Sequence, residues 1–364
     1  MTAYNNMCVS VTRQSTPDPY VTYANNNFYL TFTSGGHVEI WRARTVLDFH
    51  DRPDKHVIWR PPPNTDHSAD LWAPELHCLR GRWYVYYAAA HPAHGNKSHR
   101  MYVLGGPPAH EDPATGRWEF LGGIRGMPQQ QWAIDGTVIE LHHTLYFVYS
   151  GWPFDNHDNS EKTQEIFIIR LSDPLTADSP ATCLCQPHEP WERSGDAGIN
   201  EGPQFLAALD NSWVGLVYSC AGSWTNEYKM NTLQWLGGDP LNHASWRKGR
   251  QPLITNNNRG TGPWGPGHGS FLPIGNEIVG IFHATDSPTD GWNNRRARMQ
   301  RVCFKDGQPF MGGKVGPLAR SYDEFVSGSA GFASTLGSLQ HMELNQASIG
   351  GLLKKVKNKI KQEL

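Results

Sequence analysis

The sequence has no run of about 20 apolar residues, which is the length that a helix needs to cross a bilayer. Its first residues, Met1 to Ser10, have neither a basic start nor an apolar core, so we expect no secretory signal and no membrane span. The protein is therefore expected to be extracellular if a leader has been removed, and cytoplasmic otherwise.

An excess of charge of one sign is also missing. The 32 Lys and Arg residues nearly balance the 34 Asp and Glu residues, and the formal net charge is -2. Because the basic residues are scattered along most of the chain, no surface for a phosphate backbone is expected, which argues against a nucleic-acid partner. The six cysteines fit neither a zinc ribbon nor a dense disulfide scaffold, and we expect buried or incidental thiols.

Motifs of several enzyme classes are absent too. The sequence has no phosphate loop of the form G-x-x-x-x-G-K-[ST], no dinucleotide fingerprint, and no G-x-S-x-G nucleophile in a strand-to-helix context. Nucleotide-dependent and serine-triad chemistry is therefore not expected.

The sequence does contain a repeat. Its 14 Trp, 37 Gly and 26 Pro residues suit a folded, loop-rich protein with few long helices. Five segments share one pattern: a polar leading residue, a short apolar stretch, a turn of Asn, Gly or His, and an aromatic-rich strand. The leading residues recur at intervals of about 57 to 67 residues. They are Asp18, Glu75, Asp135, Glu201 and His268.

This repeat predicts an all-β fold, a five-bladed β-propeller that occupies residues 1–321. Strands closed in a ring protect the sheet edges and place the innermost strand of every blade beside a common axis. Equivalent residues must then converge. Asp18, Asp135, Glu201 and His268 are expected to face one central cavity, with Glu75 near it.

The repeat ends before Tyr322. Residues 322–364 are predicted to form a C-terminal tail that is first Ser- and Gly-rich and then basic. Leu352, Val356 and Ile360 recur at helical spacing, so a short amphipathic helix is expected there. A flexible tail is a simpler interpretation than a membrane-surface device.

Carboxyl groups on different blades are suited to glycosidic bond cleavage. That reaction needs a proton delivered to the leaving oxygen and a nucleophile or activated water on the opposite face of the sugar. Asp18 and Glu201 form the natural pair, and opposite blades would separate them enough for a water, which is the inverting geometry. Asp135 is placed to raise the pKa of the acid and to orient it.

Each candidate also has a plainer interpretation. An Asp before Pro is usually a turn residue, and a single Glu such as Glu201 is usually a surface carboxylate, so only their equivalence across blades favours catalysis. His268 is either a hydrogen-bonded core histidine or a ligand for a cation or water on the axis. Five tryptophans near strand ends are either core residues or platforms for sugar rings. They are Trp72, Trp132, Trp152, Trp224 and Trp264.

These segments, taken in order, resemble glycoside hydrolase family 43 over about residues 16–309. The resemblance lies in five short motifs at family-like spacing. They are Pro17-Asp18-Pro19, Trp72-Ala73-Pro74-Glu75-Leu76, Ile134-Asp135-Gly136, Asn200-Glu201-Gly202-Pro203 and Gly265-Pro266-Gly267-His268.

The resemblance implies a five-bladed propeller that inverts the anomeric configuration. It implies that Asp18 is the general base, Glu201 the general acid and Asp135 the carboxylate that tunes and orients the acid. It also implies that His268 helps hold a central calcium ion or water, although no cofactor is needed for the chemistry. Arg295 would reach the sugar in the cleavage subsite; its alternative is a solvent-facing charge in a basic run.

Within the family, the Trp-Ala-Pro-Glu-Leu-His motif at residues 72–77 resembles that of the exo-α-1,5-L-arabinofuranosidases. A monomer that acts on a plant cell-wall polysaccharide or oligosaccharide is therefore expected, with Trp72, Glu75, Trp152 and Arg295 binding the substrate. β-Xylosidase and exo-β-1,3-galactanase activities share the same skeleton. A fructan-cleaving enzyme with a covalent intermediate remains an alternative, as does a sugar-binding lectin, although lectin propellers repeat one site in every blade.

Overall fold

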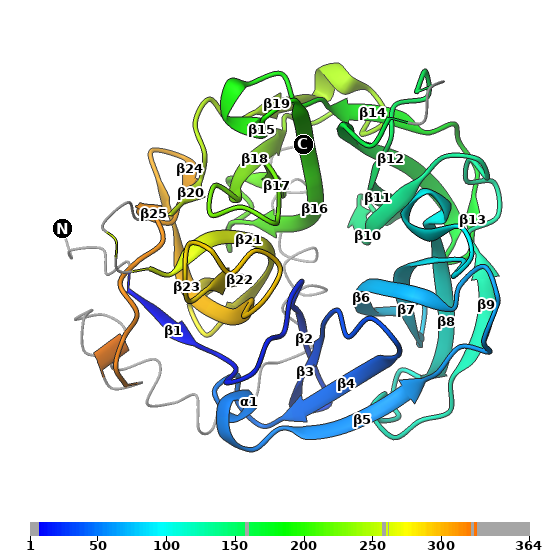
Figure 1. The fold of residues 1–364 in the computed structure, drawn as a ribbon, viewed down its shortest axis with the longest axis horizontal. Coiled ribbons are helices and arrows are strands. Elements are labelled where there is room, and N and C mark those ends of the chain that lie inside the picture. The colour runs from blue at the N-terminus through cyan, green and yellow to red at the C-terminus, as the bar shows by residue number, and fades with distance from the viewer. Residues whose placement is uncertain (1–6, 157–159, 257–259, 261, 322–323, 326–364) are drawn as a thin grey trace, which may run out of the picture.

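The computed structural model describes residues 7–156, 160–256, 260, 262–321 and 324–325. The all-β propeller prediction is confirmed: blades of antiparallel strands surround a common axis, with β2, β6, β10, β16 and β21 innermost (Figure 1). Within the described residues, no helix is long and apolar enough to cross a membrane. The helix predicted around Leu352 to Ile360 lies outside the described residues.

The first two blades are regular four-stranded sheets. Blade 1 contains β2 (Tyr20–Ala24), β3 (Asn27–Thr31), β4 (Val38–Ala43) and β5 (Asp54–Trp59). Blade 2 contains β6 (Ala69–Leu79), β7 (Arg82–Ala90), β8 (Arg100–Pro108) and β9 (Glu119–Gly123). The helices are short and lie in connections: α1 (Asp48–Asp51) and 3₁₀ turns at Gly95–Ser98, Pro190–Glu192 and His243–Ser245.

Blades 3 and 4 are joined by a short parallel pairing between β12 and β16. Blade 3 contains β10 (Ala133–Leu141), β11 (Thr144–Gly151) and β12 (Thr163–Asp173), edged by β13 (Thr176–Ala177) and β14 (Thr182–Cys185). Blade 4 contains β16 (Ala197–Ala207), β17 (Val214–Cys220) and β18 (Lys229–Trp235), edged by β15 (Arg193–Ser194), β19 (Trp246–Lys248), β20 (Ile254–Thr255) and β25 (Gly313–Lys314).

Blade 5 takes its outer strand from the other end of the chain. It contains β21 (Trp264–Ile274), β22 (Glu277–Thr285), β23 (Arg296–Lys305) and β1 (Cys8–Ser10), with β24 (Gln308–Phe310) paired to β23. In the β1–β23 pairing Val9 lies opposite Met299. The ring is thus closed by hydrogen bonds between the first and last parts of the propeller, and blades 5 and 1 pack against each other through a shared apolar cluster.

The middle strands are apolar on both faces because blades cover them from both sides. In β7, Trp83, Val85 and Tyr87 belong to the apolar cluster shared with blade 1. Tyr84 and Tyr86 alternate with them and belong to the cluster shared with blade 3. Since neighbouring side chains on a strand point to opposite faces, this aromatic run is what a strand between two blades requires.

Several predicted turns are two-residue hairpin loops. Asn25 and Asn26 join β2 to β3, and both have positive φ, at 50° and 57°. His142 and His143 join β10 to β11 in the same way, with φ of 49° and 65°. Two consecutive residues of positive φ match the right-handed twist of the flanking strands, which keeps the hairpins tight.

The packed unit extends a few residues beyond the predicted boundary at residue 321. Phe325 has an exposed fraction of 0% and lies in the cluster between blades 5 and 1. Its ring lies under the guanidinium of Arg301, 4.2 Å from the ring centroid. The beginning of the predicted tail is therefore part of the propeller core.

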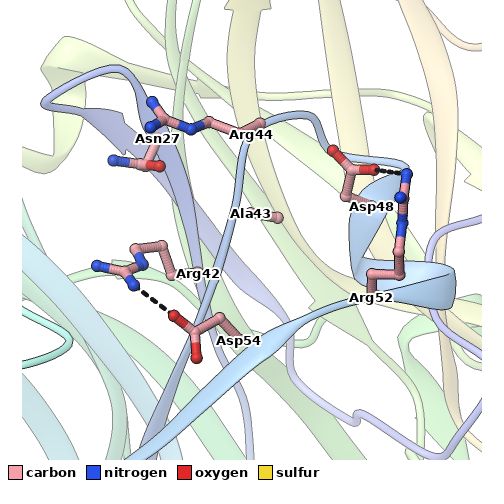
Figure 2. A pocket seen from close by; sticks show the side chains of 7 residues that line it. All are labelled: Asn27, Arg42, Ala43, Arg44, Asp48, Arg52 and Asp54. Atoms are coloured by element: carbon pink, nitrogen blue, oxygen red, sulfur yellow. Dashed lines mark hydrogen bonds and ion pairs between the residues drawn. The ribbon is translucent and has the colours of Figure 1, made fainter.

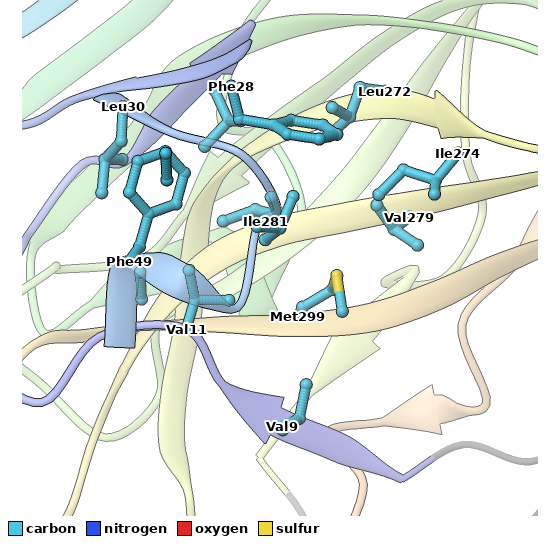
Figure 3. Packing of buried hydrophobic residues seen from close by; sticks show 14 of the residues in the cluster. Val9, Val11, Phe28, Leu30, Phe49, Leu272, Ile274, Val279, Ile281 and Met299 are labelled. Carbon is cyan, nitrogen blue, oxygen red and sulfur yellow. The ribbon is translucent and has the colours of Figure 1, made fainter. Parts of the chain in front are cut away.

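The same cluster provides a test of ring closure. Phe49 of α1 is buried in this cluster together with Leu30 of blade 1 and with Ile281 and Met299 of blade 5 (Figure 3). We expect Phe49→Ala to lower the free energy of unfolding by about 3–5 kcal/mol, because it leaves a cavity at the seam. Urea unfolding followed by tryptophan fluorescence measures it.

The matched control is Phe154→Ala, since Phe154 is 56% exposed. This substitution is expected to change the unfolding free energy by less than about 0.5 kcal/mol. Equal losses in the two variants would show that α1 does not stabilise the seam.

Candidate active site

The leading residues of the repeat sit where the innermost strands bend. The pairing register shifts between Ile134 and Thr137 in β10, and between Gly267 and Ser270 in β21. Within these bulges Asp135 and His268 have φ of 54° and 47°, and Asp18, just before β2, has φ of 57°. A bulge with a left-handed residue re-aims one side chain relative to the regular alternation of the strand.

Four of the five leading residues line one cavity. It has a volume of about 870 Å³, and its lining includes residues in or next to the innermost strands of several blades. Asp18, Asp135, Glu201 and His268 all contribute to its wall, as does Arg295. Residues more than 250 positions apart in the sequence thus meet in one place, which no single motif reveals.

The structure corrects the prediction that Glu75 contacts the substrate directly. It has an exposed fraction of 1% and does not line the cavity. Its carboxylate accepts a hydrogen bond from Gln204 and lies 2.8 Å from Nε2 of His77. Glu75 therefore holds neighbouring side chains in place behind the cavity wall.

Asp18 is surrounded by groups that favour its charged form. Arg295 Nη1 lies 3.4 Å from Oδ1, and the Thr33 hydroxyl donates to Oδ2 over 2.6 Å. His268 Nδ1 is also 3.4 Å from Oδ1. Burial alone would raise the pKa of Asp18, but the positive charge of Arg295, with smaller effects of the His268 and His283 rings, holds this pKa well below its ordinary range. Asp18 is consequently a carboxylate at neutral pH.

Glu201 experiences the opposite balance. Burial raises the pKa of its carboxyl group to about 7; a hydrogen bond from Tyr228 opposes this rise, and the negative charge of Asp18 adds to it. The group lies 2.8 Å from the Tyr228 hydroxyl through Oε1. Two carboxyl groups of one cavity therefore hold different protonation states, which is the condition for an acid and a base to act together.

Asp135 resembles Glu201 rather than Asp18, because its surroundings favour the protonated form. Its Oδ2 accepts a hydrogen bond from the backbone N–H of Gly202 over 3.0 Å, and Nδ1 of His268 is 3.8 Å away. Burial, and then the charges of Glu201 and Asp18, raise the pKa of Asp135 well above its ordinary value. Asp135 is thus able to keep a proton in the site while Asp18 stays charged.

Gly202 is required at this contact. Its φ is 56°, and a Cβ there would lie 3.1 Å from the ring of His268. The residue after Glu201 is therefore a glycine because the backbone N–H must reach Asp135 beneath a histidine ring.

Aromatic rings form much of the cavity wall. The rings of Trp132 and Trp152 are stacked with centroids 5.0 Å apart, and Trp72 stacks on His99. Trp224 and Trp292 lie at the rim, 42% and 61% exposed, with ring centroids 5.9 Å apart. Trp264, which the sequence grouped with these residues, does not line the cavity.

Sequence reasoning missed several residues of this site, among them Thr33, Tyr228, His283 and Trp292. Tyr228 precedes β18 and His283 lies in β22, so neither occupies the leading position of a repeat. Trp292 is three residues before Arg295, and its carbonyl accepts a hydrogen bond from Nε of that arginine. The position of Trp292 three residues before Arg295 was the signal in the sequence that could have placed this tryptophan in the site.

The calcium ion suggested for His268 stays a prediction. Calcium binds six to eight oxygen ligands. In the described ranges no group of three or more His, Cys, Asp or Glu side chains is arranged to hold a metal ion. The imidazole of His268 instead lies against two carboxyl groups of the site. The protein side chains do not provide the ligand set that calcium needs, so no step below depends on it.

A second cavity, of about 470 Å³, opens on the side of blade 1 (Figure 2). Arg42 pairs with Asp54 there, and Arg52 lies 3.5 Å from Asp48. Its charged groups largely neutralise one another, and it holds none of the leading residues of the repeat. The central cavity is therefore the candidate active site.

Comparison with known proteins gives a consistent result. The sequence profile of glycosyl hydrolases family 43 matches residues 9–309. Alpha-L-arabinofuranosidase 43 of Humicola insolens is 32% identical over 311 residues, which are 81% of this chain and 61% of that protein. An extracellular exo-alpha-(1->5)-L-arabinofuranosidase of Streptomyces chartreusis is 30% identical over 280 residues, 73% of this chain and 79% of its own. The chain thus spans about three fifths of the length of the Humicola relative.

A solved structure of similar shape is the alpha-L-arabinofuranosidase of Lactobacillus brevis. It is 27% identical, with a TM-score of 0.74, and the match covers 86% of this chain and 97% of that one. A thermostable family-43 glycoside hydrolase, at 19% identity and a TM-score of 0.63, has the same fold.

The raised pKa of Glu201 makes a prediction about stability. The pKa rises from 4.5 to about 7 on folding, so the folded state binds the proton more tightly and loses stability as the pH rises through this window. We expect Glu201→Gln to be more stable than the wild type by about 1–3 kcal/mol at pH 8, and similar to it at pH 4.5. Urea unfolding at the two pH values measures the difference.

Glu111→Gln is the control, because it makes the same substitution at an exposed glutamate. It should show no such dependence on pH. A stability gain of Glu201→Gln that is equal at both pH values would contradict the raised pKa.

Proposed function

This chain belongs to glycosyl hydrolases family 43, and from that premise we propose that it removes terminal α-L-arabinofuranosyl residues from α-1,5-linked arabinan or arabino-oligosaccharides, with inversion at the anomeric carbon. The observation that carries the proposal is that Asp18, paired with Arg295, and Glu201, buried beside Tyr228, face one cavity. The names of the Humicola and Streptomyces relatives support the choice of sugar.

In this mechanism each carboxyl group has one task. Glu201 gives its proton to the glycosidic oxygen as the bond between that oxygen and the anomeric carbon breaks. Asp18 accepts a proton from a water molecule, whose oxygen attacks the opposite face of the anomeric carbon. Arg295 keeps Asp18 charged until the water is in place, and Asp135 orients the acid through Gly202.

The shape of the cavity supports a substrate with one buried end. Stacked Trp132 and Trp152 form a rigid wall deep in the cavity, whereas Trp224 and Trp292 are exposed at its rim. A terminal sugar at the carboxyl groups would leave the next unit of the chain beside the rim tryptophans. This arrangement supports a chain-like sugar substrate, for which we propose a plant cell-wall polysaccharide or oligosaccharide, and the extracellular Streptomyces relative supports action outside the cell.

The first test is the anomer released. Incubation with linear α-1,5-arabino-oligosaccharides, followed by proton NMR, is expected to show single arabinose units that appear first as the β-anomer. Glu201→Gln and Asp18→Asn should lower this rate by about 10²- to 10⁴-fold, while Glu111→Gln should leave it unchanged.

Two results would contradict the proposal. First appearance of the α-anomer would indicate a covalent intermediate and overturn the roles of Asp18 and Glu201. Intact oligosaccharides would remove arabinan as the substrate, and hydrolysis of xylo- or β-1,3-galacto-oligosaccharides would then identify the alternative sugar.

The rim tryptophans generate a second prediction. Trp292→Ala should raise KM for arabinotriose by about 5- to 10-fold, equivalent to about 1 kcal/mol of binding, because a large exposed ring is lost. The kcat should change little, since Trp292 does not contact the carboxyl groups. Phe154→Ala removes an exposed ring that does not line the cavity, and its KM should match the wild type. A large fall in kcat with unchanged KM would refute a binding role.

A further inference from the structure

The two oxygens of Glu201 have different surroundings. The Tyr228 hydroxyl lies 2.8 Å from Oε1, and Tyr228 has an exposed fraction of 1%. Burial, and then the negative charges of Glu201 and Asp135, raise the pKa of Tyr228 well above its ordinary value, so its hydroxyl keeps its proton and acts as a donor. In this geometry Oε1 accepts the hydrogen bond of the Tyr228 hydroxyl.

We propose that Tyr228 is a positioning residue that selects Oε2 of Glu201 as the oxygen that carries and delivers the proton. The inference rests on the proposed function, in which Glu201 is the general acid. The carbonyl oxygen of a carboxylic acid is a stronger hydrogen-bond acceptor than its hydroxyl oxygen, so a fixed donor at Oε1 favours the form of the neutral acid that carries its proton on Oε2. Without the tyrosine hydroxyl, the proton would be shared between the two oxygens and would often point away from the substrate.

The ring of Tyr228 is fixed by close contacts. A Cβ on Gly267 would lie 2.0 Å from Cε1 of this ring, so the tyrosine packs directly against the backbone of β21. On its other side the ring stacks with His283, at a centroid distance of 5.5 Å and an interplanar angle of 11°. Gly267 of the motif Gly265-Pro266-Gly267-His268 is thus a glycine because a larger residue would clash with the ring of Tyr228.

The stacked pair of Tyr228 and His283 also contacts Asp18, the proposed general base, through His283. Nδ1 of His283 accepts a hydrogen bond from the backbone N–H of Asp18 over 3.1 Å. Nδ1 also lies 3.3 Å from Oδ1 of Asp18, and burial lowers the pKa of His283 to about 4, which keeps the ring neutral. One pair of stacked rings therefore positions the backbone of the base and the side chain of the acid.

In the reaction, the O–H bond at Oε2 breaks and an O–H bond forms on the leaving oxygen. The electron pair of the bond between this oxygen and the anomeric carbon moves to the oxygen, while water attacks the carbon and loses a proton to Asp18. Glu201 is left as a carboxylate whose Oε1 already has the Tyr228 hydrogen bond. This bond strengthens as negative charge develops, so it stabilises the transition state more than the ground state.

The effect on pH dependence has a definite sign. The charged and titratable groups that surround Glu201 or line the same cavity include Tyr228, Asp18, Asp135, Arg295, His268, Glu161 and Lys162. Burial raises the pKa of Glu201, the hydrogen bond from Tyr228 lowers it, Asp18 raises it and Arg295 lowers it. Removal of the Tyr228 hydroxyl removes a lowering contribution, so the pKa of Glu201 must rise.

The test compares Tyr228→Phe with Tyr218→Phe. Tyr218 is also buried in blade 4, and its hydroxyl donates to a glutamate, Glu192, over 2.8 Å, but it does not line the central cavity. Each variant is assayed on arabinotriose, whose leaving group needs a proton, and on 4-nitrophenyl α-L-arabinofuranoside, whose leaving group does not.

For Tyr228→Phe we expect kcat on arabinotriose to fall by about 10- to 100-fold and kcat on the nitrophenyl substrate by less than about 3-fold. The alkaline limb of kcat/KM should move up by about half to one pH unit. Tyr218→Phe should show neither effect. Equal losses on both substrates, or an unmoved alkaline limb, would overturn the proposal and leave Tyr228 a purely structural residue.

A readout without substrate separates this inference from the proposed function. Infrared difference titration, with Glu201→Gln used to identify the Glu201 carboxyl band, reports its pKa directly. A rise in Tyr228→Phe supports the inference even if no arabinoside is cleaved, in which case the proposed substrate alone is wrong. An unchanged pKa overturns the inference.

A third variant does not depend on the stability of Tyr228→Phe. Fluorotyrosine at position 228 keeps the shape of the ring and donates a stronger hydrogen bond. It should shift the Glu201 titration in the opposite direction, to lower pH. A shift to higher pH, or none, would count against the proposal.

Discussion

The ion pair between Arg295 and Asp18 determines the charge of the whole cavity. Three carboxyl groups are buried together there, and like charges in a space of low polarity cannot all be ionised. Because Arg295 is the nearby cation, it settles which group ionises first. Because Asp18 is ionised first, Glu201 and Asp135 retain their protons more readily, so that Asp18 can act as the base and Glu201 as the acid.

The fold stabilises this arrangement because each of the three carboxyl groups has a fixed hydrogen-bond partner. Asp18 is held by Thr33, Asp135 by the backbone of Gly202, and Glu201 by Tyr228. These partners come from different strands, and the blades that carry them are locked by aromatic clusters on both faces. Rigid packing of the blades is thus what keeps the carboxyl groups from moving apart to relieve their repulsion.

The sequence was sufficient for the ring and for the residues that lead each blade. Asp18, Asp135, Glu201 and His268 could be found because a propeller converts equal positions in a repeat into one place in space. Glu75 shows the limit of that logic, since the register shifts of β6 between Ala69 and Trp72 and between Trp72 and Glu75 turn its carboxylate behind the wall. Tyr228, His283 and Trp292 could not be found this way, because their roles depend on packing between blades rather than on a position within one. Phe325 was missed because the repeat had already ended.

The pairing of β1 with β23 links segments that are far apart in the chain, and Arg298 bonds to Ser10 across 288 residues. During synthesis β1 emerges first, yet its partner exists only after all the other blades have been made. Until then blade 5 lacks its edge and the short β1 segment has no sheet to join. Closure is therefore a late event of high contact order, which favours slow folding but gives a ring whose opening requires both ends of the propeller to separate at once.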